Sequence, residues 1–297
     1  MPSLQAMMFN WFMRATFRSR PIHQLDAKVL RQGADALAPS HPPRGVIRET
    51  VATPVKGEWH CAETSGDAPY VLYLHGGGYV FGSPRSHSAF TYELAKQAGA
   101  KIFSLDYRMA PEHLFPAAVE DALAAYEWLL SQGIAPGRLV IGGDSAGGGL
   151  ALALLLSIKE KGLAMPAGAF LLSLWTDLAT TGASLDTNEA SDAMFRKVHI
   201  VESARRYLGD ADPKAPLASP LYADIEGLPP LLIFASESEV LRDDATRLKD
   251  RLDAVGVDAT LITEDGLIHV WPIFPGRFPE AKKSIRQIAE FIRERMK

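Results

Sequence analysis

Ser145 lies in a pattern that suits a serine nucleophile. Gly143-Asp144-Ser145-Ala146-Gly147 is the only Gly-x-Ser-x-Gly in this chain of 297 residues, and it stands between an apolar run (138–144) and an Ala/Leu-rich stretch. In such a pattern the serine occupies a sharp strand-to-helix turn, and the small flanking residues let neighbouring segments pass close to it. We therefore predict an exposed hydroxyl at a helix start, where the helix dipole favours developing negative charge.

A nucleophilic serine needs a base, and the base needs an acid that orients it. His269 follows the last predicted strand (259–264) and precedes the last predicted helix (278–296), so a loop at the carboxyl edge of the sheet would carry it. This position makes His269 the predicted base. Three other histidines are interpreted as loop-bracing or surface residues: His75, His113 and His199.

The acid should follow the preceding predicted strand (230–236), and four carboxylates do so: Glu237, Glu239, Asp243 and Asp244. The two aspartates fall in the first turns of a predicted helix, where the dipole alone favours acidic residues. Glu239 lies in the loop and is the preferred acid, with Asp243 left open as the alternative. Ser145, Glu239 and His269 then occur in the chain order serine, acid, histidine.

Three consecutive glycines, Gly76 to Gly78, directly follow a predicted strand (70–75) that ends in His75. Glycines cost backbone entropy in regular structure, so a tight turn, a close backbone approach or free N–H groups must explain them. A nucleotide-binding loop is excluded, because no Gly-x-Gly-x-x-Gly follows a strand and no Gly-Lys-Ser/Thr occurs.

Short apolar runs alternate with helical patterns after residue 46, which indicates an α/β protein with a mostly parallel sheet. An antiparallel pair opens the series (45–54 and 55–63). The later strands are expected at 70–75, 101–107, 138–144, 168–175, 230–236 and 259–264, and the helices at 87–98, 117–132, 146–161, 240–255 and 278–296. Residues 177–220 are too long for a simple crossover and indicate an inserted helical element.

Composition narrows the class of protein. Apolar residues make up 47% and charged residues 22%, which is ordinary for a globular protein, and the net charge of −4 gives no reason to expect a nucleic-acid partner. The single cysteine, Cys61, cannot form an internal disulfide. We therefore expect a cytoplasmic protein without a structural metal.

The first twenty residues predict an amphipathic helix whose apolar residues recur at helical spacing: Leu4, Met7, Met8, Trp11, Phe12 and Ala15. Three arginines follow this stretch, whereas a secretory signal would place its charges first. The stretch is also too short to span a bilayer. We interpret it as a helix packed on the protein's own surface, and a helix lying on a membrane is the alternative.

The motifs "HGGGY", "DYRMAPEHLFPAA" and "GDSAGG" resemble those of the hormone-sensitive-lipase-like esterases (bacterial family IV, GDSAG type). The likeness runs from about residue 45 to the end. It implies an α/β-hydrolase fold with a central, mostly parallel sheet flanked by helices and covered by a helical cap. The implied division is cap 1–45, core 46–176, cap insertion 177–220 and core 221–297.

The resemblance also assigns roles. The backbone N–H groups of Gly77, Gly78 and Ala146 would form the oxyanion hole. The family's aspartate in D-P-L-R-D is replaced here by Glu239 of "EVLRD". Further expectations are that Asp106, Tyr107 and Arg108 brace the glycine loop, that Asp144 tunes the serine or is hydrogen-bonded at the turn, and that Phe195, Ile200 and Val201 either line an acyl pocket or pack ordinarily.

The function implied is a serine carboxylesterase acting on small-molecule esters of short to medium acyl chains, without a metal or organic cofactor. Homodimerisation through the last strand or helix is a further implication. Three alternatives stay open: the same three residues acting on amides, lactones or acetylated metabolites; a non-catalytic ligand-binding member of the fold, which the presence of His269 disfavours; and a lipase working at a lipid interface.

Overall fold

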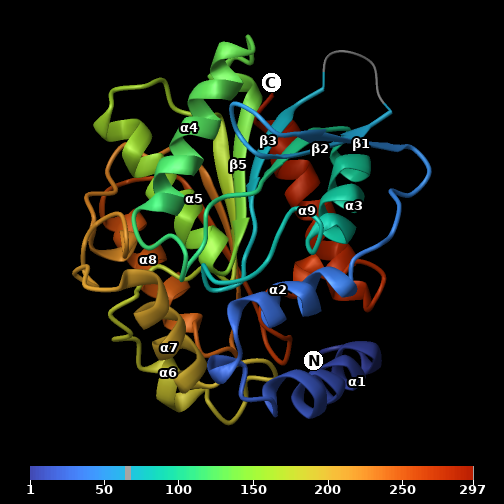
Figure 1. Cartoon of the computed structure of the whole chain (residues 1–297), viewed down its shortest axis with the longest axis vertical. Coiled ribbons are helices and arrows are strands. Elements are labelled where there is room, and N and C mark those ends of the chain that lie inside the picture. Colours follow the sequence, from blue (N-terminus) through green and yellow to red (C-terminus); the bar gives the residue numbers. More distant parts are fainter. Residues whose placement is uncertain (64–67, 297) are drawn as a thin grey trace.

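Eight strands form one sheet in the computed structural model, which describes residues 1–63 and 68–296. The sheet order is β1-β2-β4-β3-β5-β6-β7-β8 (Figure 1). The strands are β1 (Val46–Val51), β2 (Gly57–Ala62), β3 (Tyr70–Leu74), β4 (Lys101–Leu105), β5 (Leu139–Asp144), β6 (Gly168–Leu172), β7 (Leu231–Ser236) and β8 (Ala259–Glu264).

Strand direction follows the sequence-based prediction. β1 and β2 are antiparallel to each other, and β2 is antiparallel to β4, whereas every pair from β4 to β8 is parallel. The carboxyl ends of β3, β5 and β7 therefore meet at one edge of the sheet. This is the mostly parallel sheet of the α/β-hydrolase fold, as predicted.

Helices cover both faces of the sheet. On one face α4 (Ala117–Ser131), α5 (Ala146–Glu160) and α8 (Arg242–Ala254) enclose a core of aliphatic side chains. On the other face α3 (Ser88–Ala98) packs against α9 (Pro279–Glu294) (Figure 1). β5, β6 and β7, which lie between these layers, are wholly buried, and this explains why they form continuous apolar runs rather than alternating ones.

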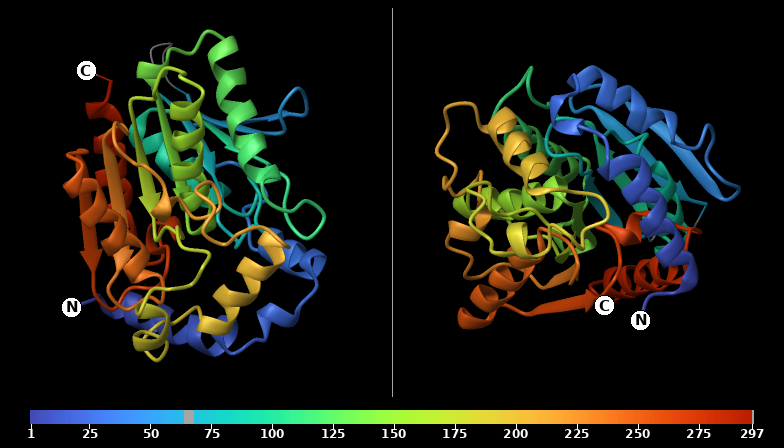
Figure 2. Two further views of the ribbon diagram at one scale, coloured as in Figure 1. Left: turned by 90° about the vertical axis from the view of Figure 1, so that its left-hand side faces the viewer. Right: turned by 90° about the horizontal axis from the view of Figure 1, so that it is seen from below.

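The two segments that the resemblance assigns to a cap lie together at one end of the sheet (Figures 1 and 2). The first contains α1 (Leu4–Met13), a π-helical turn (Arg14–Arg18) and α2 (Ala27–Ala36), and the second contains α6 (Ser184–Thr187) and α7 (Lys197–Leu208). Arg206 of α7 joins them, because its guanidinium donates to the carbonyls of Leu25 and His23. Of the division predicted above, residues 64–67 and 297 lie outside the described residues.

The helix predicted near the N-terminus forms, but its periodic apolar face points outward. Its inner side packs through Ala6 and through Phe9, whose ring centroid lies 5.1 Å from that of Phe274. The outer side leaves Trp11 72% and Met8 64% exposed. Among the described residues, no helix is long and apolar enough to cross a membrane.

Candidate active site

Ser145 sits at a strained turn between β5 and α5. Its φ of 53° and ψ of −121° are unusual for a residue with a side chain. Hydrogen bonds on both sides hold the turn, because the Ser145 N–H donates to the Leu172 carbonyl (2.8 Å) and its own carbonyl accepts from the Trp175 N–H (3.0 Å). The strain is sustained by these hydrogen bonds. Ser145 is only 9% exposed and lines a cavity, so the predicted exposed hydroxyl faces this cavity rather than the molecular surface.

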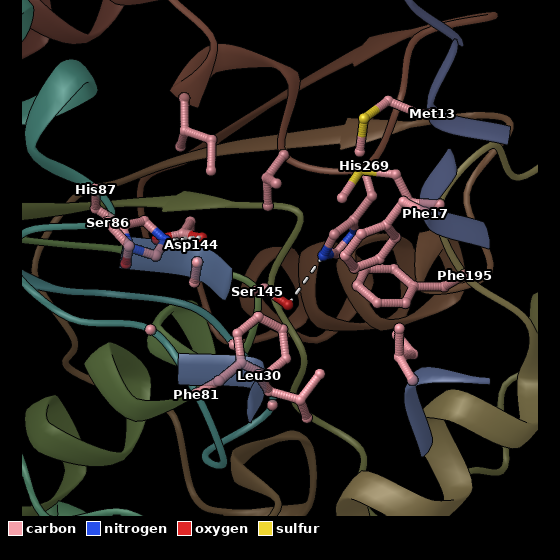
Figure 3. A pocket seen from close by; sticks show the side chains of 18 of the residues that line it. Met13, Phe17, Leu30, Phe81, Ser86, His87, Asp144, Ser145, Phe195 and His269 are labelled. Carbon is pink, nitrogen blue, oxygen red and sulfur yellow. Dashed lines mark hydrogen bonds and ion pairs between the residues drawn. The ribbon is translucent and has the colours of Figure 1, made fainter. Parts of the chain in front are cut away.

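Ser145, His269 and Glu239 come together in a chain of short contacts. Nε2 of His269 lies 2.9 Å from Oγ of Ser145, and Nδ1 lies 2.5 Å from Oε2 of Glu239. The other oxygen of Glu239 accepts from the Ser236 N–H at 2.9 Å. The dashed line in Figure 3 marks the contact between Ser145 and His269. This order of contacts fixes His269 between a hydroxyl and a carboxylate, as proton transfer from the serine requires.

The protonation of His269 is set by opposing effects. Burial lowers its pKa, but the charge and the hydrogen bond of Glu239 outweigh burial, so the pKa stands above the ordinary 6.5. Both side chains are almost completely buried. Glu239 therefore favours the imidazolium that forms when His269 accepts a proton.

The alternative acids have other partners. Asp243 accepts from the Ser184 N–H and pairs with Arg242. Asp244 is buried and accepts from the N–H groups of Thr176 and Asp177, and burial raises its pKa to about 8. Neither aspartate has a hydrogen bond to His269, which leaves Glu239 as the carboxylate in contact with the histidine.

The glycine loop borders Ser145 with free backbone donors. The N–H groups of Gly77, Gly78 and Ala146 make no hydrogen bond to the described part of the chain. Gly77 has a φ of 118°, and a Cβ built there would lie 2.0 Å from the Phe81 carbonyl oxygen. Glycine is therefore required at position 77 both by the backbone conformation and by the close approach of this carbonyl.

Asp144 joins the serine turn to the glycine loop. Its Oδ1 accepts from the Tyr73 hydroxyl (2.5 Å) and from the Gly76 N–H (2.9 Å), and its Oδ2 lies 3.4 Å from Nε2 of His87. Burial raises the pKa of Asp144, yet His87 and Tyr73 outweigh burial and the net shift is downward. Asp144 is thus an ionised, hydrogen-bonded anchor rather than an idle neighbour of the serine.

The expectation that residues 106 to 108 brace the glycine loop is correct only for Tyr107. Its hydroxyl donates to the His75 carbonyl at 2.7 Å, and its ring stacks on that of His75. Asp106 instead pairs with Lys56, and Arg108 pairs with Asp121 at the start of α4. Asp106 and Arg108 therefore form ion pairs with neighbouring segments and make none with the glycine loop.

A cavity of about 690 Å³ opens above Ser145 (Figure 3). Apolar and aromatic side chains form most of its wall, among them Met13, Phe17, Leu30, Phe81 and Phe195. Ile200 also lines the cavity, as anticipated, whereas Val201 does not and is 41% exposed. The side chains of Ile200 and Val201 point in different directions because successive residues of a helix are about 100° apart around its axis.

Two of the three histidines interpreted above as loop-bracing or surface residues are buried, His75 and His199. His199, interpreted above as a loop or surface residue, is buried and lines the cavity, and its Nδ1 accepts from the Arg196 N–H. Burial lowers its pKa to about 4. His75 is buried within the glycine loop, where its Nδ1 lies 2.9 Å from the Gly76 carbonyl oxygen, and burial lowers its pKa to about 4.

Known proteins share this architecture. Residues 71–273 match a family model described as the alpha/beta hydrolase fold. The chain is 44% identical to an acetyl-hydrolase of Streptomyces hygroscopicus over 227 residues, or 76% of each protein. Its structure is similar to a crystal structure of EstE5 soaked with p-nitrophenyl butyrate (TM-score 0.93, 41% identity, 99% of each chain covered). It is equally similar to the crystal structure of an esterase from the bacterial hormone-sensitive lipase family (TM-score 0.93, 41% identity, 100% of each chain covered).

The chain belongs to this family of α/β-hydrolase esterases. It is a serine carboxylesterase, as its motifs predicted.

Two residues of the esterase that sequence reasoning missed connect the 177–220 segment to the loop of Glu239. Asn188 donates from Nδ2 to the carbonyls of Glu237 (2.8 Å) and Glu239 (2.9 Å). Asp192 accepts from the Val240 N–H with one oxygen and from the Phe195 N–H with the other. Asparagine and aspartate in an irregular stretch signal backbone hydrogen bonding, but the sequence does not reveal that the partners lie some fifty residues away.

Proposed function

We propose that this esterase hydrolyses small carboxylic esters through an acyl-enzyme on Ser145. His269 would accept the proton of Ser145 as the hydroxyl oxygen attacks the ester carbonyl, and would then deliver it to the departing alcohol. Glu239 would hold the imidazole and stabilise its charge. The single observation that carries this proposal is the continuous contact from Ser145 through His269 to Glu239 beside an apolar cavity.

The attack places negative charge on the carbonyl oxygen, which needs donors fixed in advance. The free N–H groups of Gly77, Gly78 and Ala146 support an oxyanion hole here. One such donor contributes about 3 kcal/mol to transition-state stabilisation. Water activated by His269 would then attack the acyl-enzyme, releasing the acid and restoring Ser145.

We propose substrates with short to medium acyl chains. A cavity of about 690 Å³ lies in the range of small-molecule sites, and its apolar wall suits an acyl chain rather than a charged group. EstE5 was soaked with p-nitrophenyl butyrate and the Streptomyces relative is named an acetyl-hydrolase, which supports starting from two- and four-carbon acyl groups.

We further propose that 1–45 and 177–220 act together as a cap over the core formed by 46–176 and 221–297. Both cap segments contribute to the cavity wall, the first through Phe17 and the second through Phe195, and this supports the division.

A cytoplasmic location is proposed because the chain has one cysteine. A homodimer through β8 or α9 is proposed, and the position of β8 at the sheet edge supports the strand.

The experiment is hydrolysis of p-nitrophenyl esters from acetate to palmitate by the wild type and by Ser145→Ala. We expect kcat/KM to peak at short or medium chains and to fall by roughly 10⁴-fold or more in the variant. Serine-dependent turnover of amides or lactones in place of all these esters would overturn the proposed substrate class. Turnover that survives in Ser145→Ala would overturn the proposed nucleophile.

A further inference from the structure

The exposed apolar side chains of this esterase are concentrated on the two cap segments. Thirteen large apolar side chains are exposed in the described part of the chain. Ten of them fall within 1–37 and 197–208: Met1, Leu4, Met7, Met8, Trp11, Phe12, Val29, Leu37, Val198 and Val201. A helix on the surface of a water-soluble domain normally presents polar side chains outward, so this distribution calls for a partner.

Five of these residues make one continuous stripe on α1, which we call the α1 face: Leu4, Met7, Met8, Trp11 and Phe12. Their spacing of three and four residues puts them on the same side of the helix. The opposite side is already packed, because Ala6 and Phe9 contact the core around Phe274 and Phe278. The α1 face is therefore additional apolar surface, and folding of this chain does not cover it.

The segment that carries the α1 face has an excess of positively charged residues. Residues 1–25 contain three arginines and no acidic residue, although the whole chain has a net charge of −4. Arg14 donates only to the carbonyls of Ala190 and Ser191, and the side chains of Arg20 and Arg277 have no hydrogen bond or ion pair in the described part of the chain. None of Arg14, Arg20 and Arg277 pairs with a carboxylate in the described part of the chain, although Glu280 accepts from the N–H and the hydroxyl of Ser3 at the start of α1. The arginines still outnumber this carboxylate, so the face suits an anionic partner.

These charges favour a lipid surface over a second copy of the chain. A symmetric dimer through the α1 face would bring the same arginines of both copies together, because each copy contributes the same patch. An anionic bilayer offers apolar depth for the helix side chains and phosphate groups for the arginines.

The α1 face is also continuous with the mouth of the active-site cavity. Phe12 belongs to the face, is 51% exposed and lines the cavity, and Leu37 lines the same cavity while being 89% exposed. Phe9, Met13 and Phe17 of the same segment extend the apolar wall inward toward Ser145. A surface that contacts the α1 face would thus lie at the entrance used by substrate.

We propose that the α1 face docks this esterase on an anionic lipid surface, so that esters dissolved in the lipid enter the cavity past Phe12 and Leu37. Docking needs no catalysis, whereas delivery of esters rests on the function proposed above. Met8 and Trp11 do not line the cavity, so changing them separates docking from hydrolysis of a water-soluble ester.

The test is co-sedimentation of the full chain with vesicles of equal parts phosphatidylglycerol and phosphatidylcholine, or of phosphatidylcholine alone. The docking variant is Met8→Gln/Trp11→Gln. The matched control is Ile47→Gln/Val255→Gln, which changes two exposed apolar residues outside the cap segments. All proteins are also assayed on p-nitrophenyl acetate, and Ser145→Ala is tested for vesicle binding to keep docking independent of turnover.

We expect binding to the anionic vesicles that falls about tenfold or more in the docking variant and stays within about twofold in the control. Arg20→Gln should weaken binding by about fivefold, and phosphatidylcholine alone should bind weakly. Unchanged p-nitrophenyl acetate turnover in the docking variant would support separate roles. Absent vesicle binding, equal binding by the docking variant, or a dimer that the docking variant dissolves would overturn the proposal.

Discussion

The carboxylate of Asp144, next to Ser145 in sequence, accepts a hydrogen bond from the Gly76 N–H at 2.9 Å. The residue beside the proposed nucleophile therefore holds the start of the loop that carries two proposed oxyanion donors. Serine attack and oxyanion binding depend on the relative position of these two segments, because the reacting carbonyl must reach both at once.

We predict that Asp144→Asn lowers kcat by about 10- to 100-fold with a smaller change in KM, because the loop would lose its charged anchor while the cavity wall stays in place. The readout is steady-state kinetics on p-nitrophenyl butyrate. Asp106→Asn is the matched control, since Asp106 pairs with Lys56 away from the loop, and it should retain near-wild-type kcat. A kcat for Asp144→Asn equal to that of the control would contradict the anchoring role.

The pH dependence of kcat/KM should report His269. The base must be neutral to accept a proton, so activity should fall as pH drops through its pKa, and this pKa is raised. We predict an acid limb centred above 6.5, measured between about pH 5 and 9.

Glu239→Gln should move that limb to lower pH, because burial would then act on the pKa of His269 without the charge and hydrogen bond of Glu239, which oppose burial most strongly. The variant should also lose roughly 10³- to 10⁴-fold in kcat. An acid limb that does not move in Glu239→Gln would argue that another group sets it.

Asn188→Leu should destabilise the protein and slow catalysis together. The variant would remove the side-chain donor to the Glu237 carbonyl and one of the two donors to the Glu239 carbonyl, which also accepts from the Arg242 N–H, and this costs about 1–3 kcal/mol of unfolding free energy. Denaturant unfolding and kcat are the measurements. Thr187→Val is the control, because Thr187 is exposed and its hydroxyl makes only a long hydrogen bond (3.4 Å) to the amide oxygen of Asn188, which leaves both carbonyls with their donor. Wild-type stability in Asn188→Leu would show that the two carbonyls find other partners.

Gly77→Ala should lower kcat by about 10²- to 10³-fold, because the new Cβ would collide with the Phe81 carbonyl and displace the proposed oxyanion donor. Gly133→Ala separates this collision from backbone strain alone, since Gly133 also has a positive φ but open space around it. We expect Gly133→Ala to retain full activity and to lose only some stability. Equal activity of the two variants would show that position 77 tolerates a side chain.

Much of this architecture could be predicted from local pattern. The inner strands β3, β5, β6 and β7 are apolar because helices cover both faces of the sheet, and such buried strands form apolar runs that can be recognised in the sequence. Ser145 and His269 could be selected because each lies beside an element boundary whose position follows from those runs. The outward direction of the α1 face could not be predicted, because periodicity identifies an apolar side without saying whether protein, lipid or water meets it.

The sequence alone determined the element order, the serine motif and the candidates for base and acid, because these depend on residue type and spacing along the chain. Only the tertiary structure decided which carboxylate meets His269, which of residues 106 to 108 reaches the glycine loop, and how Asn188 and Asp192 hold the loop of Glu239. Contacts between residues distant in the chain follow from how strands and loops pack in three dimensions. Residue spacing along the chain therefore does not indicate which distant residues form hydrogen bonds with each other.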